Sequence, residues 1–167
     1  MKLKKAVVMT DDEYEVLLEE LDGLRKSVVL DQDPIAVGLD EINRKLATIQ
    51  TSRDRASSIV CDAIINKNLA QRLQNSKQYE FEKKASNLFM TSADVKALKS
   101  AELRKASIET TLSDDLAAAH DSDNVVSKAD TFLKYASAVA KDLEIKNENL
   151  VQQTYVVQLI LKVHPTV

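Results

Sequence analysis

Glycine and proline are nearly absent from this chain of 167 residues, which has only two of each. A chain of average composition and this length would have about 12 glycines and about 8 prolines. Neither residue occurs from Leu39 to His164, a run of 126 residues. Because tight reversals depend on glycine and proline, the chain can turn back only a few times, and its elements must be long.

Tryptophan is also absent, and aromatic residues make up only 4% of the chain, which argues against a thick compact core. The single cysteine, Cys61, excludes an internal disulfide, and a cysteine-type metal site is excluded because no cysteine or histidine lies near it. Its position beside an apolar helical seam predicts a small buried residue. The apolar run from Ala6 to Met9 is too short for a signal sequence or a membrane span, so a soluble, cytosolic protein is expected.

The first apolar pattern predicts a short amphipathic helix over about residues 11–29. Thr10 and Glu13 have the spacing of a capping box, and Asp11 and Asp12 suit the positive end of the helix dipole. Before this helix, Lys4 to Met9 fits either a short strand or a disordered arm. Residues 1–32 are therefore expected to form an N-terminal arm and one short helix.

Residues 33–167 have the pattern of two very long helices. Asp33 and Pro34 suit the start of the first, which is expected over about residues 35–88 with a length of ~80 Å. Its seam recurs in steps of three and four at Leu39, Ile42, Leu46, Ile49, Arg53, Ala56, Val60 and Ala63. A reversal is expected near residues 90–100, where Thr91–Asp94 and Ser100 offer caps. The last helix then runs to about His164, although Tyr155 to Val163 also fits a strand.

These patterns predict an all-α fold, a long antiparallel helical hairpin or coiled coil preceded by a short helix. A two-helix hairpin buries only one stripe of each helix, so further apolar residues would stay exposed. Exposed apolar area of this extent usually marks an interface, and self-association into a homo-oligomer is the simplest way to cover it. The predicted interface residues are Ile59, Ile64, Ile65, Val157, Ile160 and Leu161.

Nothing in the chain indicates catalysis. The sequence has no glycine-rich phosphate loop, no HExxH motif and no nucleophile elbow. His120, with Asp121 beside it and Asp123 three residues on, allows a weak metal site, but a solvated helical face explains the same residues better. We therefore expect no enzyme activity, no cofactor and no metal.

Charge is distributed unevenly. The chain has a net charge of −3, yet residues 67–105 alone have nine basic and four acidic residues, a charge of +5, which leaves −8 for the rest. Three of the seven aromatic residues also fall in this segment. Basic side chains neutralise phosphates and aromatic rings stack on bases, so the combination suits single-stranded DNA. The predicted contacts are Arg72, Lys77, Tyr79, Phe81, Lys83, Lys84, Lys96, Lys99, Arg104 and Lys105.

Two stretches in this segment, Tyr79 to Lys84 and Thr91 to Lys99, resemble the UvsY-type recombination mediators of tailed bacteriophages. Leu69 to Leu73 is similar to the DNA-contacting helix segment of that family, with Arg72 at the matching arginine and Ala70 where its best-known member has a lysine. The pattern of apolar and charged residues is similar over roughly residues 40–160, and the residues themselves are similar at about 25 of these positions. It implies a ring-shaped homo-oligomer that binds single-stranded DNA. Such a protein helps to load a RecA-like recombinase onto strands covered by a single-strand-binding protein.

Two interpretations stay open at this point. In the first, the chain is a recombination mediator in the cytoplasm of a phage-infected host, and the basic segment contacts DNA. In the second, it is a coiled-coil structural or assembly protein of a virion, which acts only through protein–protein contacts. Neither interpretation involves a membrane. Both predict oligomers, and they differ in what the basic segment does.

Overall fold

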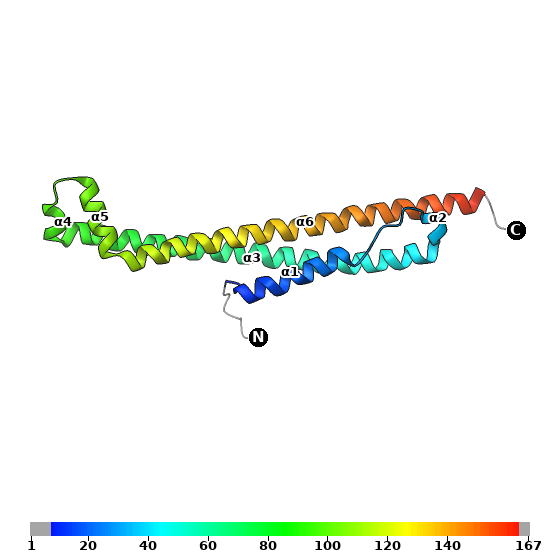
Figure 1. Ribbon diagram of the computed structural model, residues 1–167, viewed down its shortest axis with the longest axis horizontal. Helices are drawn as coiled ribbons and strands as arrows, with labels where there is room; N and C mark the ends of the chain where they lie inside the picture. The colour runs from blue at the N-terminus through cyan, green and yellow to red at the C-terminus, as the bar shows by residue number, and fades with distance from the viewer. Residues whose placement is uncertain (1–7, 164–167) are drawn as a thin grey trace. The chain divides into compact units, whose positions relative to one another are not determined.

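The computed structural model describes residues 8–163, and these residues are almost entirely helical with no strand (Figure 1). The helices are α1 (Asp11–Lys26), α2 (Pro34–Val37), α3 (Leu39–Thr91), α4 (Ala93–Ala97), α5 (Ala101–Thr111) and α6 (Ser113–Val163). The all-α prediction is confirmed, and Tyr155 to Val163 is helix rather than strand. Most of the arm expected at Lys4 to Met9 lies outside the described residues.

The chain divides into two compact units, and α3 and α6 each contribute to both. Among the described residues, unit 1 contains Val8 and residues 65–131, and unit 2 contains residues 9–64 and 132–163. None of the described helices is both long and apolar enough to cross a membrane.

The core of unit 2 lies between three helices, where α1 packs on the first half of α3 and the second half of α6 (Figure 1). Its core includes Leu21 of α1, Ile49 of α3 and Leu143 of α6, all fully buried. The ring of Tyr14 meets that of Phe132 edge to face, with 5.1 Å between centroids. Complete burial of an aliphatic side chain such as Leu21, Ile49 or Leu143 stabilises a fold by roughly 1.5–3 kcal/mol.

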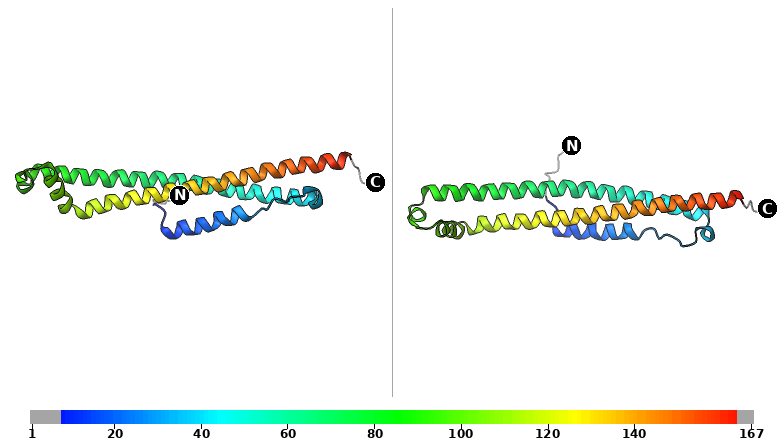
Figure 2. Two further views of the ribbon diagram at one scale, coloured as in Figure 1. Left: turned by 45° about the horizontal axis from the view of Figure 1, so that its top comes forward. Right: turned by 90° about the horizontal axis from the view of Figure 1, so that it is seen from above.

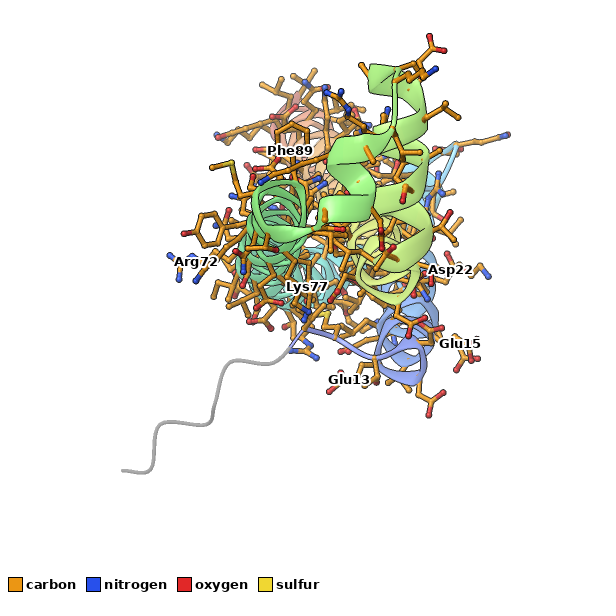
Figure 3. The ribbon with its side chains drawn as sticks, turned by 90° about the vertical axis from the view of Figure 1, so that its left-hand side faces the viewer. Glu13, Glu15, Asp22, Arg72, Lys77 and Phe89 are labelled. Carbon is orange, nitrogen blue, oxygen red and sulfur yellow. The ribbon has the colours of Figure 1, made fainter. Side chains whose placement is uncertain are left out.

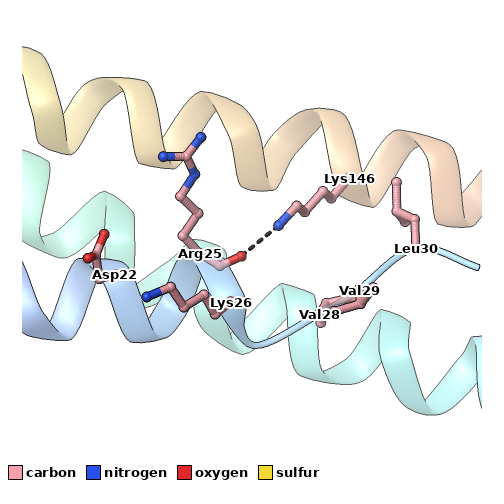
Figure 4. A pocket seen from close by; sticks show the side chains of 7 residues that line it. All are labelled: Asp22, Arg25, Lys26, Val28, Val29, Leu30 and Lys146. Carbon is pink, nitrogen blue, oxygen red and sulfur yellow. Dashed lines mark hydrogen bonds between the residues drawn. The ribbon is translucent and has the colours of Figure 1, made fainter.

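The start of α1 is the expected capping box. The Thr10 hydroxyl accepts a hydrogen bond from the amide of Glu13 (3.3 Å), and the Glu13 carboxylate accepts one from the amide of Thr10 (2.7 Å). The helix ends at Lys26, where Lys146 of α6 donates a hydrogen bond to the free carbonyl of Arg25 (2.6 Å, Figure 4). A basic side chain at this end also suits the helix dipole.

The second helix does not run unbroken from Pro34. The Asp33 carboxylate accepts hydrogen bonds from the amides of Ile35 (3.0 Å) and Ala36 (3.2 Å), as an N-cap should, but α2 ends after four residues. Gly38 then has φ of 82°, a conformation that breaks the helix and that L side chains rarely adopt. The long helix α3 therefore begins at Leu39.

The buried face of α3 in unit 2 differs from the predicted seam. Ser52 and Ile59 are buried, whereas Arg53 and Val60 are only partly buried beside them. The physical reason is that α3 packs on α1 as well as on α6 in unit 2. The side chains that α1 covers are therefore buried in addition to those that face α6. The prediction that Ile59 lies at an oligomer interface is therefore wrong, since Ile59 is fully buried within the chain.

Two further residues are placed differently from their prediction. Val157 was expected at an oligomer interface, yet it is 96% buried in the core of unit 2 because it continues the stripe of Leu143 and Leu150. Cys61 was expected to be buried, but it is exposed. It lies two residues from both Ile59 and Ala63, and that offset turns its side chain away from the core.

Unit 1 contains the reversal (Figure 2). The second half of α3 and the first half of α6 run antiparallel, as the partners of Lys67 (Asp130) and Lys84 (Asp115) show. Two short helices lie between them. Ser100 caps the second as predicted, accepting from the amide of Leu103, whereas the cap of the first is Ser92, which accepts from the amide of Val95, and not Thr91, which ends α3. The last helix was expected to be continuous, but a bend at Leu112 (φ −108°, ψ 32°) separates α5 from α6.

Candidate nucleic-acid interface

All ten residues predicted to contact nucleic acid lie in unit 1, but they do not form a single cluster. Six of them are on α3, two flank the end of α4, and two are on α5. Three situations can be distinguished: cations already bound to acidic groups, exposed side chains on one side of α3, and an aromatic pocket between α3 and α5.

The basic segment is neutralised inside its own unit. Lys84 forms an ion pair with Asp115, and Lys67 with Asp130, so the acidic start of α6 lies along the basic part of α3. The hydrogen bond and charge of Asp115 raise the pKa of Lys84. Asp123 accepts a hydrogen bond from Gln74 at 2.6 Å.

Residues 65–131 contain ten basic and ten acidic side chains, so this part of unit 1 has no formal net charge. The basic charge of the segment that contains the predicted reversal therefore does not extend to the unit into which this segment folds. The segment 67–105 is basic in sequence, but residues 109–130, which pack back along it, include six acidic side chains and a single lysine.

Three more of the predicted contacts have partners close by in sequence. Lys77 pairs with Glu80 (3.2 Å), and Lys105 pairs with Glu109 (3.7 Å). The Nε group of Arg104 donates a hydrogen bond to the backbone carbonyl of Leu98 at 2.8 Å, which fixes the guanidinium group over the reversal. Lys96 and Lys99 are exposed and form no ion pair with any described residue.

One side of α3 in unit 1 is exposed along its whole length, and we call it the outer stripe. The exposed side chain of Glu82, three residues after Tyr79 and four before Ser86, lies at its edge. At 3.6 residues per turn its members share one face of the helix. They are Ile65, Asn68, Arg72, Asn75, Ser76, Tyr79, Lys83, Ser86 and Met90, all exposed.

Among the outer-stripe residues, Tyr79 is 65% exposed and Met90 is 66% exposed. The side chain of Arg72 extends away from the helices (Figure 3). Neither Arg72 nor Lys83 forms an ion pair with a described residue. The sequence prediction included Arg72, Tyr79 and Lys83 of this stripe. It missed the asparagines, serines and Met90, which the same helical period would have identified.

Phe81 points away from the outer stripe, into a pocket of about 400 Å³ between α3 and α5. Its lining residues are Phe81, Ala85, Phe89, Ala101, Arg104, Lys105, Ile108 and Glu109. Phe89, which the site prediction did not include, is 41% exposed at this pocket. No sequence signal identified the pocket, because it depends on how the reversal places α5.

No group of three or more acidic, histidine or cysteine side chains that could hold a metal ion occurs among residues 8–163. His120 is exposed, and its Nδ1 atom lies 3.9 Å from an Asp123 oxygen, as on a solvated helical face. The arrangement of unit 1 therefore offers binding surfaces, namely a weakly basic stripe and an aromatic pocket.

The other residues predicted at the oligomer interface differ in their exposure. Ile64 (45%), Ile65 (56%) and Leu161 (49%) are exposed as expected, and Ile160 is partly buried. Near the described end of α6, Tyr155, Val156, Leu159 and Val163 are exposed as well. No charged residue occurs between Glu148 and Lys162.

In comparisons with known proteins, the chain matches no protein-family model, no curated protein and no solved structure. The resemblance to UvsY-type mediators therefore stays a prediction.

Proposed function

We propose that this protein is a non-enzymatic, self-associating helical protein that binds single-stranded DNA through the outer stripe of α3. In the form that the sequence resemblance suggests, it is a recombination mediator that acts in the cytoplasm of a phage-infected host and helps a RecA-like recombinase onto DNA. The outer stripe is the observation that carries this proposal. It combines two cations that form no ion pair with a described residue, a largely exposed tyrosine and several neutral hydrogen-bonding side chains, and the nearest acidic residues, Glu80 and Glu82, lie at its edges.

The chemistry of the outer stripe matches what single strands need. Arg72 and Lys83 can neutralise phosphates, Tyr79 offers a ring face for stacking, and the asparagines and serines can donate to phosphate or base oxygens. Glu80, which lies close to this face, is drawn towards Lys77 by their ion pair. With unit 1 neutral overall, one copy binds weakly, and several copies in one oligomer would multiply the contacts.

Self-association is expected at the exposed apolar end of α6, the C-terminal patch of Tyr155, Val156, Leu159 and Val163. Leu161 is exposed on another side of the helix, in line with the buried Val157. Residues 149–161 contain no charged side chain. In a two-fold contact the same surface of both copies meets, so a surface with charges of one sign would repel its own copy. Apart from Lys162 near the described end of α6, this apolar surface has no charge, so such repulsion is small.

Fluorescence anisotropy with a labelled single-stranded oligonucleotide tests the DNA-binding part. We expect binding at low salt that weakens steeply as salt rises. Arg72→Gln with Lys83→Gln should lower affinity and reduce the salt slope by about 1.4 per bound copy, from ~0.7 for each phosphate contact in single strands. Lys141→Gln, at an exposed lysine of unit 2, is the control. No binding by the oligomer at low salt would contradict the proposal.

The second candidate is a structural or assembly protein of a virion that acts only through protein contacts. The neutrality of unit 1 is the observation that favours it, because a surface without net charge attracts a polyanion poorly. This candidate predicts self-association through the C-terminal patch and no affinity for DNA at any salt concentration. The anisotropy experiment therefore separates the two.

A further inference from the structure

We infer that the pocket between α3 and α5 is a base-binding subsite, which takes one unstacked base of a single-stranded nucleic acid while Arg104 contacts the adjoining phosphate. This inference rests on the proposed DNA-binding function, and it adds a site away from the outer stripe.

The walls of the pocket come from two helix faces that meet at the reversal. Phe81, Ala85 and Phe89 recur every four residues on α3, and Ala101, Arg104 and Ile108 recur at helical spacing on α5. Two phenyl rings with small alanines beside them leave an apolar space with aromatic faces. A volume of about 400 Å³ falls within the range of small-ligand pockets.

Charge at the pocket selects the kind of ligand. Lys105 and Glu109 pair with each other, which leaves Arg104 as the unneutralised charge of the lining. Its Nε hydrogen bond to Leu98 holds the guanidinium group in place, and its terminal nitrogens have no partner among the described residues. An apolar aromatic space beside a fixed cation complements a flat ring that is joined to an anion. A nucleotide unit has that chemistry.

The position of Phe89 supports an accessible stacking surface. Its side chain is 41% exposed although the ring lies on an apolar pocket, so folding of the chain alone leaves part of the ring uncovered. Stacking of a base on an aromatic side chain is sequence-tolerant, because every base has a ring face. The subsite should therefore accept any base, with little preference for sequence.

The test compares an oligonucleotide with an abasic strand of the same length, which keeps the phosphates and loses the bases. Anisotropy measures the affinity of the full-length protein for both. The wild type should prefer the strand with bases, and Phe89→Ala should reduce that affinity by about 5- to 150-fold, the range of stacking losses on alanine substitution. The affinity of Phe89→Ala for the abasic strand should equal that of the wild type.

Phe89→Tyr keeps a ring face and should restore the preference for bases. Val16→Ala, at a residue of α1 in unit 2 that is 63% exposed and belongs to neither proposed site, serves as the control. Circular dichroism checks that each variant stays helical. If Phe89→Ala binds both strands as the wild type does, the subsite is wrong and the outer-stripe proposal stands. If the wild type binds neither strand at low salt, both proposals are wrong.

Discussion

At the scale of single residues, one charged pair between α1 and α3 in unit 2 stands out. Both Nε and Nη2 of Arg55 donate to the Glu20 carboxylate, at 2.6 Å and 2.7 Å. These hydrogen bonds lower the pKa of Glu20 from its ordinary value of 4.5. A carboxylate with a lowered pKa stabilises the fold above its unfolded-state pKa, and this contribution is lost as pH falls through the folded-state pKa.

Glu20→Gln should therefore lower the free energy of unfolding at neutral pH by up to about 1 kcal/mol, the usual range for exposed pairs. The difference between variant and wild type should shrink once the pH is well below 4.5. Urea unfolding followed by circular dichroism at several pH values measures this. Glu19→Gln, whose carboxylate has no partner among the described residues, is the matched control. An equal loss from both variants would show that the pair contributes nothing specific.

The acidic residues that neutralise unit 1 give a second prediction at this scale. Asp115→Asn with Asp123→Asn frees Lys84 and gives unit 1 a charge of about +2. We expect single-stranded DNA to bind roughly two- to tenfold more tightly at low salt. This factor corresponds to about 1 kcal/mol of binding free energy, the usual size of an exposed ion pair. Anisotropy with a labelled strand is the measurement, and Asp54→Asn in unit 2 is the control. An unchanged affinity would mean that the strand does not approach this surface.

At the scale of elements, the sequence predicts helix starts more reliably than it predicts which faces are buried. Thr10 and Ser100 act as caps as predicted, because capping depends on residues three positions apart. The capping-box pattern of Thr91–Asp94 indicated a cap at Thr91, and the cap is its neighbour Ser92. The phase of the α3 seam could not be predicted in the same way. It depends on where α1 docks, and that contact joins residues far apart in the chain, such as Glu20 and Arg55.

The break at Gly38 is also a property of an element, and it was missed because a lone glycine in a helical pattern is often tolerated. Gly38→Ala should destabilise unit 2 by about 1–3 kcal/mol, since φ of 82° with ψ of 161° strains any L side chain. Gly23→Ala should instead stabilise α1 by about 0.5–1 kcal/mol, because a Cβ there meets nothing within 4 Å. Thermal unfolding of both variants checks the contrast. A harmless Gly38→Ala would mean that α2 and α3 can join as one helix.

At the scale of the whole molecule, length and composition were sufficient to predict the all-α class, and charge was not sufficient to predict the site. Few glycines and prolines leave few turns, so long helices follow directly from the sequence. The net charge of a surface depends instead on which segments pack together. Antiparallel packing in unit 1 places acidic residues such as Asp115 and Asp130 on lysines that looked free in the sequence.

Self-association through the C-terminal patch is the prediction that belongs to this scale. Leu159→Lys places a charge on a residue that is 61% exposed and should lower the mass of the oligomer in solution. Light scattering after size-exclusion chromatography measures that mass. Val29→Lys, at a residue that is 71% exposed in the segment after α1, should leave it unchanged. An unchanged mass for Leu159→Lys would place the interface elsewhere.

The claim that the protein self-associates and binds single-stranded DNA is tested most directly by sedimentation velocity. The protein is sedimented with a fluorescently labelled single strand at low salt, and protein and DNA are recorded at separate wavelengths. If the protein assembles and binds as proposed, protein and DNA will sediment together as one species that contains several chains. Raising the salt concentration should release the DNA while the assembly persists, because phosphate contacts are salt-dependent and apolar contacts are not weakened by salt. A monomer that sediments apart from free DNA would contradict the account.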